Sequence, residues 1–159
     1  MRLGQRGPST ENRQIAPCAV SGYNSCCKMA NRFLDWLKQA DADLRHANHA
    51  LDSADYEWGC FAAQQAAEKA LKALYYKLGK EAWGHTVSAL MGSLPAEFAP
   101  ETNLTECAKL LDKHYILTRN PDGFDSGAPT DFYTKTEGEA AITCAKEIIE
   151  FCRNKINKT

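Results

Sequence analysis

Apolar residues recur at helical spacing along most of the chain, and this periodicity restricts the fold to a class built from α-helices. In residues 33–51 the spacing alternates between four and three residues, which keeps every one of these side chains on one face of a helix. That stripe consists of Phe33, Leu37, Ala40, Leu44, Ala47 and Leu51. No segment shows the clear alternation of apolar and polar residues that is typical of a half-buried strand. We therefore predict an all-α fold.

A second helix is predicted from Tyr56 to Leu78, and its alanine content places it at the centre of the fold. Asp55 precedes it as a candidate N-cap, and Gly79 follows it as a candidate C′ residue. The alanines lie on two faces, where small side chains let neighbouring helices approach closely. They are Ala62, Ala63, Ala66, Ala67, Ala70 and Ala73.

Three more helices are expected in the second half of the chain. A short one follows Gly84, and a fourth begins near Asn103, where Glu106 completes a capping-box pattern. A similar pattern, Thr134 with Glu137, marks the start of the last helix. These elements predict an up-and-down helical bundle of four to five helices, with the first, second and last helices packed side by side.

Charge and composition divide the chain at about residue 28. Residues 1–28 hold four basic groups and one acidic group, several glycines and prolines, and no helical repeat, whereas residues 29–159 hold 15 basic and 19 acidic groups. We expect 1–28 to be a disordered leader or an upstream extension, with Met29 as the native start of a domain covering 29–159. The acidic domain argues against non-specific nucleic-acid coating, which needs a basic surface. No apolar run approaches the roughly 20 residues of a membrane span.

The seven cysteines indicate a reducing compartment and not a disulfide framework or a metal site. Their number is odd, they are irregularly spaced, and none forms a CxxC motif. Four of them fall on or beside predicted buried stripes, where reduced thiols are the usual state in the cytoplasm. We therefore expect a cytoplasmic protein without a metal or another cofactor.

Several segments, in this order, resemble the HEPN domain family, and in particular a prokaryotic branch with a Tyr-x-x-x-Arg-Tyr-Pro-Asp signature. The resemblance extends from about Asn31 to Ile156, and Asn120 stands where the branch often has tyrosine. The matching segments are Cys60–Leu74, Gly84–Thr86 with Leu90, His114–Asp122, and Phe132–Thr134. The resemblance implies an all-α bundle that is commonly a homodimer. It also implies nucleotide or RNA binding and a small nucleotidyltransferase as partner in a toxin–antitoxin-like pair.

Some branches of that family are metal-independent ribonucleases whose site combines arginine with a histidine five to seven positions later. Arg119 has no histidine after it, and His49 follows Arg45 at one residue less than the required distance. The motif is therefore absent, although a rearranged site that uses His114 and Arg119 stays open. Histidine could move a proton near neutral pH while arginine holds a phosphate.

Residues 117–132 form a long polar segment, and such segments within compact domains are usually functional or disordered. We expect Arg119 to bind phosphate with its planar guanidinium. Tyr115 and Tyr133 would stack on a base or donate a hydroxyl group, and Asp122 would orient Arg119. The alternative is purely structural, with an Arg119–Asp122 salt bridge that pins the segment to the bundle and tyrosines that belong to the core.

The other polar and aromatic candidates have simpler interpretations. His46 and His49 are expected to be exposed polar residues and not metal ligands, since no third ligand accompanies them. His85 is expected to be a cap or a core partner. Two alternatives to the nucleotide-binding accessory remain, namely the ribonuclease described above and a protein-interaction module that binds no nucleotide.

Overall fold

The computed structural model describes the backbone from residue 24 to residue 159 and the side chains from residue 32 onward. Every regular element in this part of the chain is helical, which confirms the predicted all-α class. The α-helices are α1 (Asn24–Asp52), α2 (Tyr56–Lys77), α3 (Val87–Gly92), α4 (Thr102–Asp112) and α5 (Lys135–Asn157). Three short 3-10 turns, Ala96–Phe98, Pro121–Gly123 and Pro129–Asp131, lie between them.

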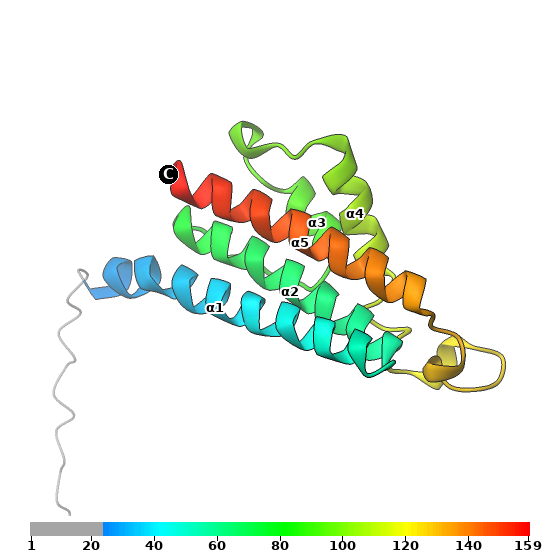
Figure 1. The fold of residues 1–159 in the computed structure, drawn as a ribbon. Helices are drawn as coiled ribbons and strands as arrows, with labels where there is room; N and C mark the ends of the chain where they lie inside the picture. Colours follow the sequence, from blue (N-terminus) through cyan, green and yellow to red (C-terminus); the bar gives the residue numbers. More distant parts are fainter. Residues whose placement is uncertain (1–23) are drawn as a thin grey trace, which may run out of the picture.

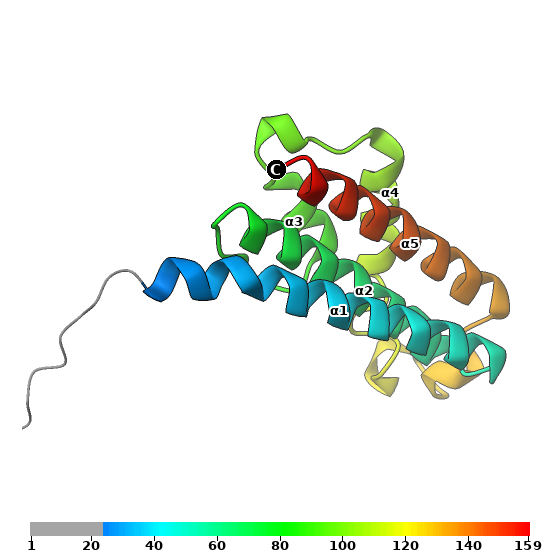
Figure 2. The same cartoon turned by 60° about the vertical axis from the view of Figure 1, so that its left-hand side comes forward.

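Helices α1, α2 and α5 lie side by side with α2 in the middle, as predicted (Figure 1). The shorter helices α3 and α4 pack against this layer, and a view turned by 60° shows them beside α2 and α5 (Figure 2). Helix α2 contacts each of the other four α-helices. Its alanines make this possible, because a small side chain lets two helix backbones approach closely. Ala63, Ala66, Ala67, Ala70 and Ala73 are completely buried.

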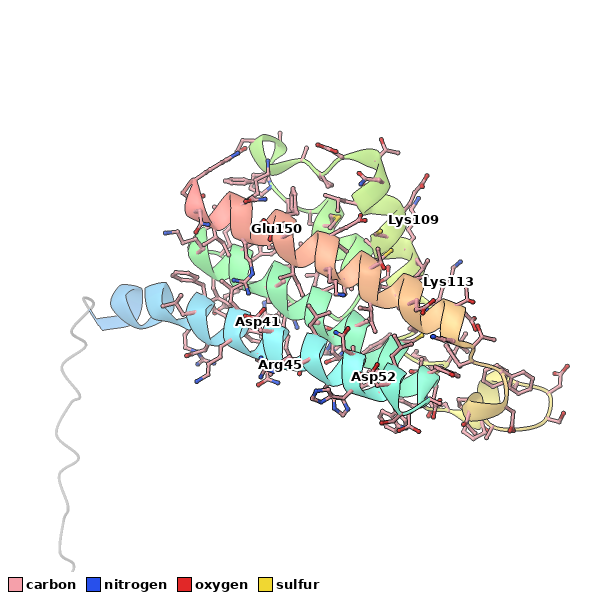
Figure 3. All side chains as sticks on the ribbon, in the orientation of Figure 1. Asp41, Arg45, Asp52, Lys109, Lys113 and Glu150 are labelled. Atoms are coloured by element: carbon pink, nitrogen blue, oxygen red, sulfur yellow. The ribbon has the colours of Figure 1, made fainter. Side chains whose placement is uncertain are left out.

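Charged side chains lie on the outward faces of the long helices. Arg45 and Asp52 extend from α1, and Glu150 extends from α5, whereas Asp41 of α1 forms an ion pair with Arg153 of α5 (Figure 3). The apolar stripes of the same helices face inward, where Leu71, Leu74 and other large side chains are fully buried. This separation gives one continuous hydrophobic core around α2.

Two of the four predicted helix ends are confirmed in detail. Gly79 follows α2 with a φ of +68°, the left-handed conformation that favours glycine at a C′ position. At the start of α5, the Glu137 backbone N–H donates to Thr134 Oγ1 at 3.4 Å, and the Thr134 N–H donates to the Glu137 carboxylate at 2.9 Å. This is the predicted capping box.

The other two predicted caps are not formed. Asp55 is at the N-cap position of α2, but its side chain makes no capping hydrogen bond. The Asn103–Glu106 capping box is wrong, because α4 begins at Thr102 and Glu101 is its N-cap residue. Asn103 is thus already inside the first turn, where its side chain cannot accept from the N–H groups that a cap serves.

Helix α1 begins at Asn24, which lies inside the segment predicted to be a leader. Residues 1–23 lie outside the described part of the chain, so the leader and the start at Met29 stay predictions. Among residues 24–159, no helix combines the length and the apolar character needed to cross a membrane.

Candidate functional site

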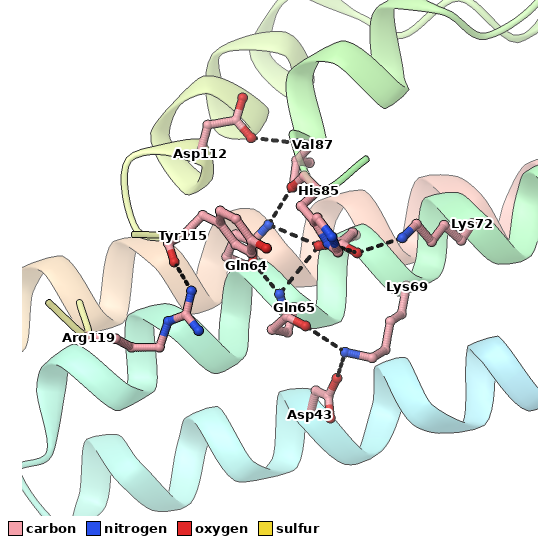
Figure 4. Close-up of polar contacts among 11 residues, drawn as sticks. Asp43, Gln64, Gln65, Lys69, Lys72, His85, Val87, Asp112, Tyr115 and Arg119 are labelled. Atoms are coloured by element: carbon pink, nitrogen blue, oxygen red, sulfur yellow. Dashed lines mark hydrogen bonds and ion pairs between the residues drawn. The ribbon is translucent and has the colours of Figure 1, made fainter. Parts of the chain in front are cut away.

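Arg119 lies on the segment that follows α4, and aromatic rings and a backbone carbonyl hold its guanidinium in place (Figure 4). Its Cζ atom is 4.1 Å from the centre of the Phe61 ring on α2 and 5.3 Å from that of Tyr115. Its Nη2 donates to the Tyr115 carbonyl oxygen at 2.5 Å. The side chain is exposed, so its remaining N–H groups are open to a ligand.

The predicted Arg119–Asp122 salt bridge is not formed. Within residues 32–159, no carboxylate lies within ion-pair distance of Arg119. Asp122 is exposed in the Pro121–Gly123 turn. Arg119 therefore keeps its positive charge uncompensated by any described neighbour, while its orientation is fixed by Phe61 and Tyr115.

Tyr115 connects Arg119 to a polar cluster on α2. Its ring stacks on the His85 imidazole, with centroids 5.1 Å apart and an interplanar angle of 11°. The His85 Nδ1 atom lies 3.1 Å from Glu68 Oε1, and 55% of the His85 side chain is exposed. The prediction that His85 is a cap or a core partner is therefore wrong. His85 is a half-exposed imidazole that lies within hydrogen-bond distance of a buried carboxylate.

Glu68 is the centre of this cluster, and its side chain is only 4% exposed. Lys72 Nζ donates to Oε1 at 2.8 Å, and Gln64 and Gln65 donate to Oε2 at 3.4 and 3.3 Å. Burying an anion without partners is costly, so these donors explain how Glu68 can be buried. Gln64 also donates to the His85 carbonyl oxygen at 2.8 Å, which holds the loop before α3 against α2.

Asp112, the last residue of α4, fixes the start of α3. Its carboxylate accepts from the backbone N–H of Val87 at 2.6 Å, and from the N–H and hydroxyl of Ser88 at 3.2 and 2.5 Å. The first N–H groups of a helix lack acceptors within the helix, and the Asp112 carboxylate on α4 is the acceptor for two of those of α3. His85 and Tyr115, which flank this contact in the sequence, are thereby held near each other.

His114 contacts Tyr133, and neither residue is among the contacts of Arg119. His114 is buried, and its Nδ1 atom is 3.4 Å from the Tyr133 hydroxyl. Burial lowers the pKa of the His114 imidazole, although the charge of Glu137 opposes this shift and the smaller effect of Lys113 assists it. Burial, with smaller effects of Cys60 and Glu137, raises the pKa of Tyr133 to about 12.

The four predicted ligand-binding residues thus fall into separate environments. Arg119 and Tyr115 are in contact, Asp122 is exposed on the following turn, and Tyr133 packs with His114. The contacts of His114 and those of Arg119 have no residue in common. His46 is exposed, as expected, and no group of three or more metal-ligating side chains occurs among the described residues.

Sequence reasoning missed Glu68 and His85 as members of the site. One signal was present, since Glu68 and Lys72 form an i,i+4 pair on the polar strip of α2, opposite the alanines. The contact of Glu68 with His85 depended on the path of the loop between α2 and α3.

Comparisons with known proteins agree with this architecture. The family model of the HEPN domain matches residues 33–155. A protein of Methanocaldococcus jannaschii named "Putative toxin MJ1304" is 27% identical over 143 residues, which cover 84% of this chain and 91% of that protein.

Three solved structures are also similar. TT1696 from Thermus thermophilus is 47% identical with a TM-score of 0.77, over 79% of this chain and 98% of that one. ST0689, described as an archaeal HEPN homologue, is 39% identical with a TM-score of 0.67, over 78% and 97%. A HEPN domain protein from Thermotoga maritima is 36% identical with a TM-score of 0.65, over 79% and 99%.

Proposed function

The chain belongs to the HEPN domain family, and from this premise we propose that it binds the phosphate of a nucleotide or of RNA through Arg119. We further propose that it acts as a homodimeric cytoplasmic accessory of a small nucleotidyltransferase in a toxin–antitoxin-like pair. The similarity to a protein named as a toxin supports the second part. The first part depends on the geometry around Arg119.

One observation carries the phosphate-binding proposal, namely an exposed guanidinium that is oriented without a carboxylate. The aromatic faces of Phe61 and Tyr115 and one carbonyl oxygen hold Arg119 in place. A side chain fixed in this way loses little conformational freedom on binding, and its remaining donors fit two oxygens of a phosphate. A structural arginine that pins a loop would instead be neutralised by an acid such as Asp122.

The geometry favours binding over a ribonuclease that uses His114 with Arg119. His114 is buried against Tyr133, whereas Arg119 is exposed beside Phe61. A general base must come within hydrogen-bond reach of the hydroxyl that it deprotonates, and these two side chains face different surroundings. Incubation of RNA with the protein and EDTA checks this, since cleavage that survives the chelator and is lost in His114→Ala would favour the enzyme.

Isothermal titration of the full chain with AMP and with a five-nucleotide oligoadenylate tests the proposal. We expect Arg119→Ala to weaken binding about 10- to 100-fold, since hydrogen bonds to charged groups contribute about 1.5–3 kcal/mol. Arg119→Lys should give an intermediate affinity, because lysine keeps the charge but not the planar fork. Arg45→Ala removes another exposed arginine, on α1, and serves as the control. Equal affinities for wild type and Arg119→Ala would refute phosphate binding at this residue.

The nucleotidyltransferase partner requires a separate experiment. We expect the product of the neighbouring gene to be a small nucleotidyltransferase. Co-expression of the two chains, followed by size-exclusion chromatography, should then yield a complex that contains both. Formation of the complex without any effect of nucleotide on either chain would favour the pure interaction module. Separate elution of the two chains would contradict the partner assignment.

A further inference from the structure

A cleft of about 330 Å³ opens beside His85, between the first half of α1, the end of α2 and the loop that follows α2. Three aromatic and three polar side chains line it, together with Ala82 and Gly84. The aromatic residues are Trp36, Tyr76 and Trp83, and the polar residues are Lys72, Glu81 and His85.

The aromatic walls offer both a rigid surface and an accessible one. The rings of Trp36 and Tyr76 are stacked, with centroids 5.8 Å apart and an interplanar angle of 19°. Trp83, by contrast, is 85% exposed on its loop. A flat aromatic ligand can stack on such an indole whatever its identity, and this is how many proteins hold the bases of single-stranded nucleic acids.

The polar groups of the cleft determine which hydrogen-bonding groups the ligand must carry at its edge. Glu68 Oε1 accepts from Lys72 Nζ at 2.8 Å and lies 3.1 Å from His85 Nδ1. Since an ionised carboxylate only accepts hydrogen bonds, the proton of a neutral His85 is placed on Nδ1, and Nε2 is left as an acceptor. The Glu81 carboxylate is a second acceptor, whereas the Lys72 side chain is only 11% exposed, since its ammonium is bound to Glu68 and lies 5.5 Å from the centre of the Trp36 ring.

The cleft and Arg119 are connected through Tyr115. The Tyr115 ring stacks on His85, and the Tyr115 carbonyl oxygen accepts from Arg119, so that Tyr115 lies between the two (Figure 4). An aromatic cleft with hydrogen-bond acceptors thus adjoins an uncompensated cation. A nucleotide is the ligand that combines an aromatic base bearing N–H donors with a phosphate.

We propose that this cleft binds the base of the nucleotide whose phosphate is held by Arg119, with Trp83 stacking on the base and His85 Nε2 accepting a hydrogen bond from its edge. This inference rests on the proposed function and adds the part of the site that recognises the base. Because both available edge groups are acceptors, the cleft favours a base with an exocyclic amino group. Adenosine should therefore bind more tightly than uridine.

The experiment separates the two halves of the ligand. Adenosine carries the base without phosphate, and ribose 5-phosphate carries the phosphate without the base. We expect Trp83→Ala to weaken adenosine binding by about fivefold or more, because it removes the base–aromatic stacking. His85→Ala should also weaken adenosine binding, because it removes the hydrogen bond to the base edge, and both variants should leave ribose 5-phosphate binding unchanged. Arg119→Ala should show the reverse pattern. Trp58→Ala, which removes a half-exposed indole elsewhere on α2, is the matched control.

NMR provides a readout that does not depend on the variants. The chain has three tryptophans, so adenosine should shift the indole N–H signal of Trp83 and leave that of Trp58 in place.

Glu68→Gln tests the positioning role of Glu68, because an amide can donate to Nδ1 and move the His85 proton to Nε2. The ¹⁵N signals of His85 report this change directly, and adenosine affinity should fall with it while the urea midpoint verifies folding.

The outcomes distinguish the inference from the function on which it rests. If only ribose 5-phosphate binds, in a manner that depends on Arg119, the cleft proposal is overturned and phosphate binding stands. If adenosine binds through Trp83 but Arg119→Ala leaves AMP affinity unchanged, the cleft is supported and the phosphate proposal fails. Comparison of AMP with the oligoadenylate shows whether the natural ligand is a free nucleotide or an unpaired RNA base.

Discussion

The guanidinium of Arg119 lies against the aromatic ring of Phe61, with 4.1 Å between Cζ and the ring centre. The two residues are far apart in the sequence, and the contact joins the segment after α4 to the central helix. A cation over an aromatic ring is attracted by the negative face of that ring, which orients the charge without neutralising it. The ring therefore holds the guanidinium in one orientation while leaving its charge for a phosphate.

Replacing Phe61 with leucine should weaken AMP binding about two- to fivefold, because an exposed cation–π contact contributes about 0.5–1 kcal/mol. Leucine retains most of the apolar volume but has no aromatic face for Arg119. Isothermal titration measures the change. Trp58→Leu removes the ring that meets Phe61 edge-on and should leave the affinity unaltered. Identical affinities for Phe61→Leu and wild type would show that the ring does not support Arg119.

Asp112→Ala should lower the free energy of unfolding by about 1–2 kcal/mol, since it removes the acceptor for Val87 N–H, Ser88 N–H and the Ser88 hydroxyl. Urea denaturation followed by circular dichroism measures the effect. Asp125→Ala, a change of the same kind on an exposed loop residue, should stay within about 0.5 kcal/mol of wild type. A loss of similar size in both variants would mean that the α3 cap contributes nothing specific.

Buried His114 should make the protein less stable in mild acid. Burial lowers its pKa in the folded state below 6.5, so the unfolded chain binds the proton more tightly. The stability that neutral His114 contributes is thus complete above about pH 6.5 and declines as the pH falls toward the folded-state pKa. Urea midpoints between pH 7.5 and 5 should fall less steeply for His114→Gln than for wild type. His46→Gln, at an exposed position, should keep the wild-type slope.

The thiols of the folded domain should react slowly with Ellman's reagent at pH 8. Burial, assisted by the charges of Glu137 and Glu57, raises the pKa of Cys60 to about 12, and burial raises the pKa of Cys107 to about 12. Only the thiolate attacks the reagent, so little of either side chain is reactive. The experiment uses a background in which the three cysteines before residue 29 are replaced, namely Cys18→Ser, Cys26→Ser and Cys27→Ser.

Cys107 is half-buried whereas Cys60 is fully buried, so Cys107 should react before Cys60. Addition of urea above the unfolding midpoint should expose all the thiols and give a rapid burst. Rapid modification of every cysteine without denaturant would contradict the burial described above.

The sequence predicted the helices and several of their ends from residues that lie close together in the chain. The stripe that begins at Phe33 predicted α1, and the alanines after Ala62 predicted the central place of α2. Thr134 with Glu137 and Gly79 marked helix ends correctly, because each of these signals acts within a few residues of the chain. The Asn103–Glu106 pattern failed, since the N-cap residue of α4 is Glu101, two residues before the predicted cap.

The site was only partly predicted. Arg119 and Tyr115 were identified together and are in contact, but Asp122 does not pair with Arg119 and His85 is not a core residue. A guanidinium can be held by a carboxylate, a carbonyl oxygen or an aromatic ring, and all three occur within a few residues of Arg119 in the sequence. The position of Phe61 relative to the segment after α4 decided among them.

The sequence by itself determined the helices of this protein and their approximate ends, because these follow from interactions between residues close in the chain. The alanines of α2 also indicated its central place. Only the tertiary structure decided that Glu68 meets His85, that Asp112 caps α3 and that Arg119 lies on Phe61. Each of these contacts joins different elements, and each depends on how the helices pack and how the loops between them run. Spacing within a helix fixes which face a side chain occupies, but it does not specify which other element comes to that face.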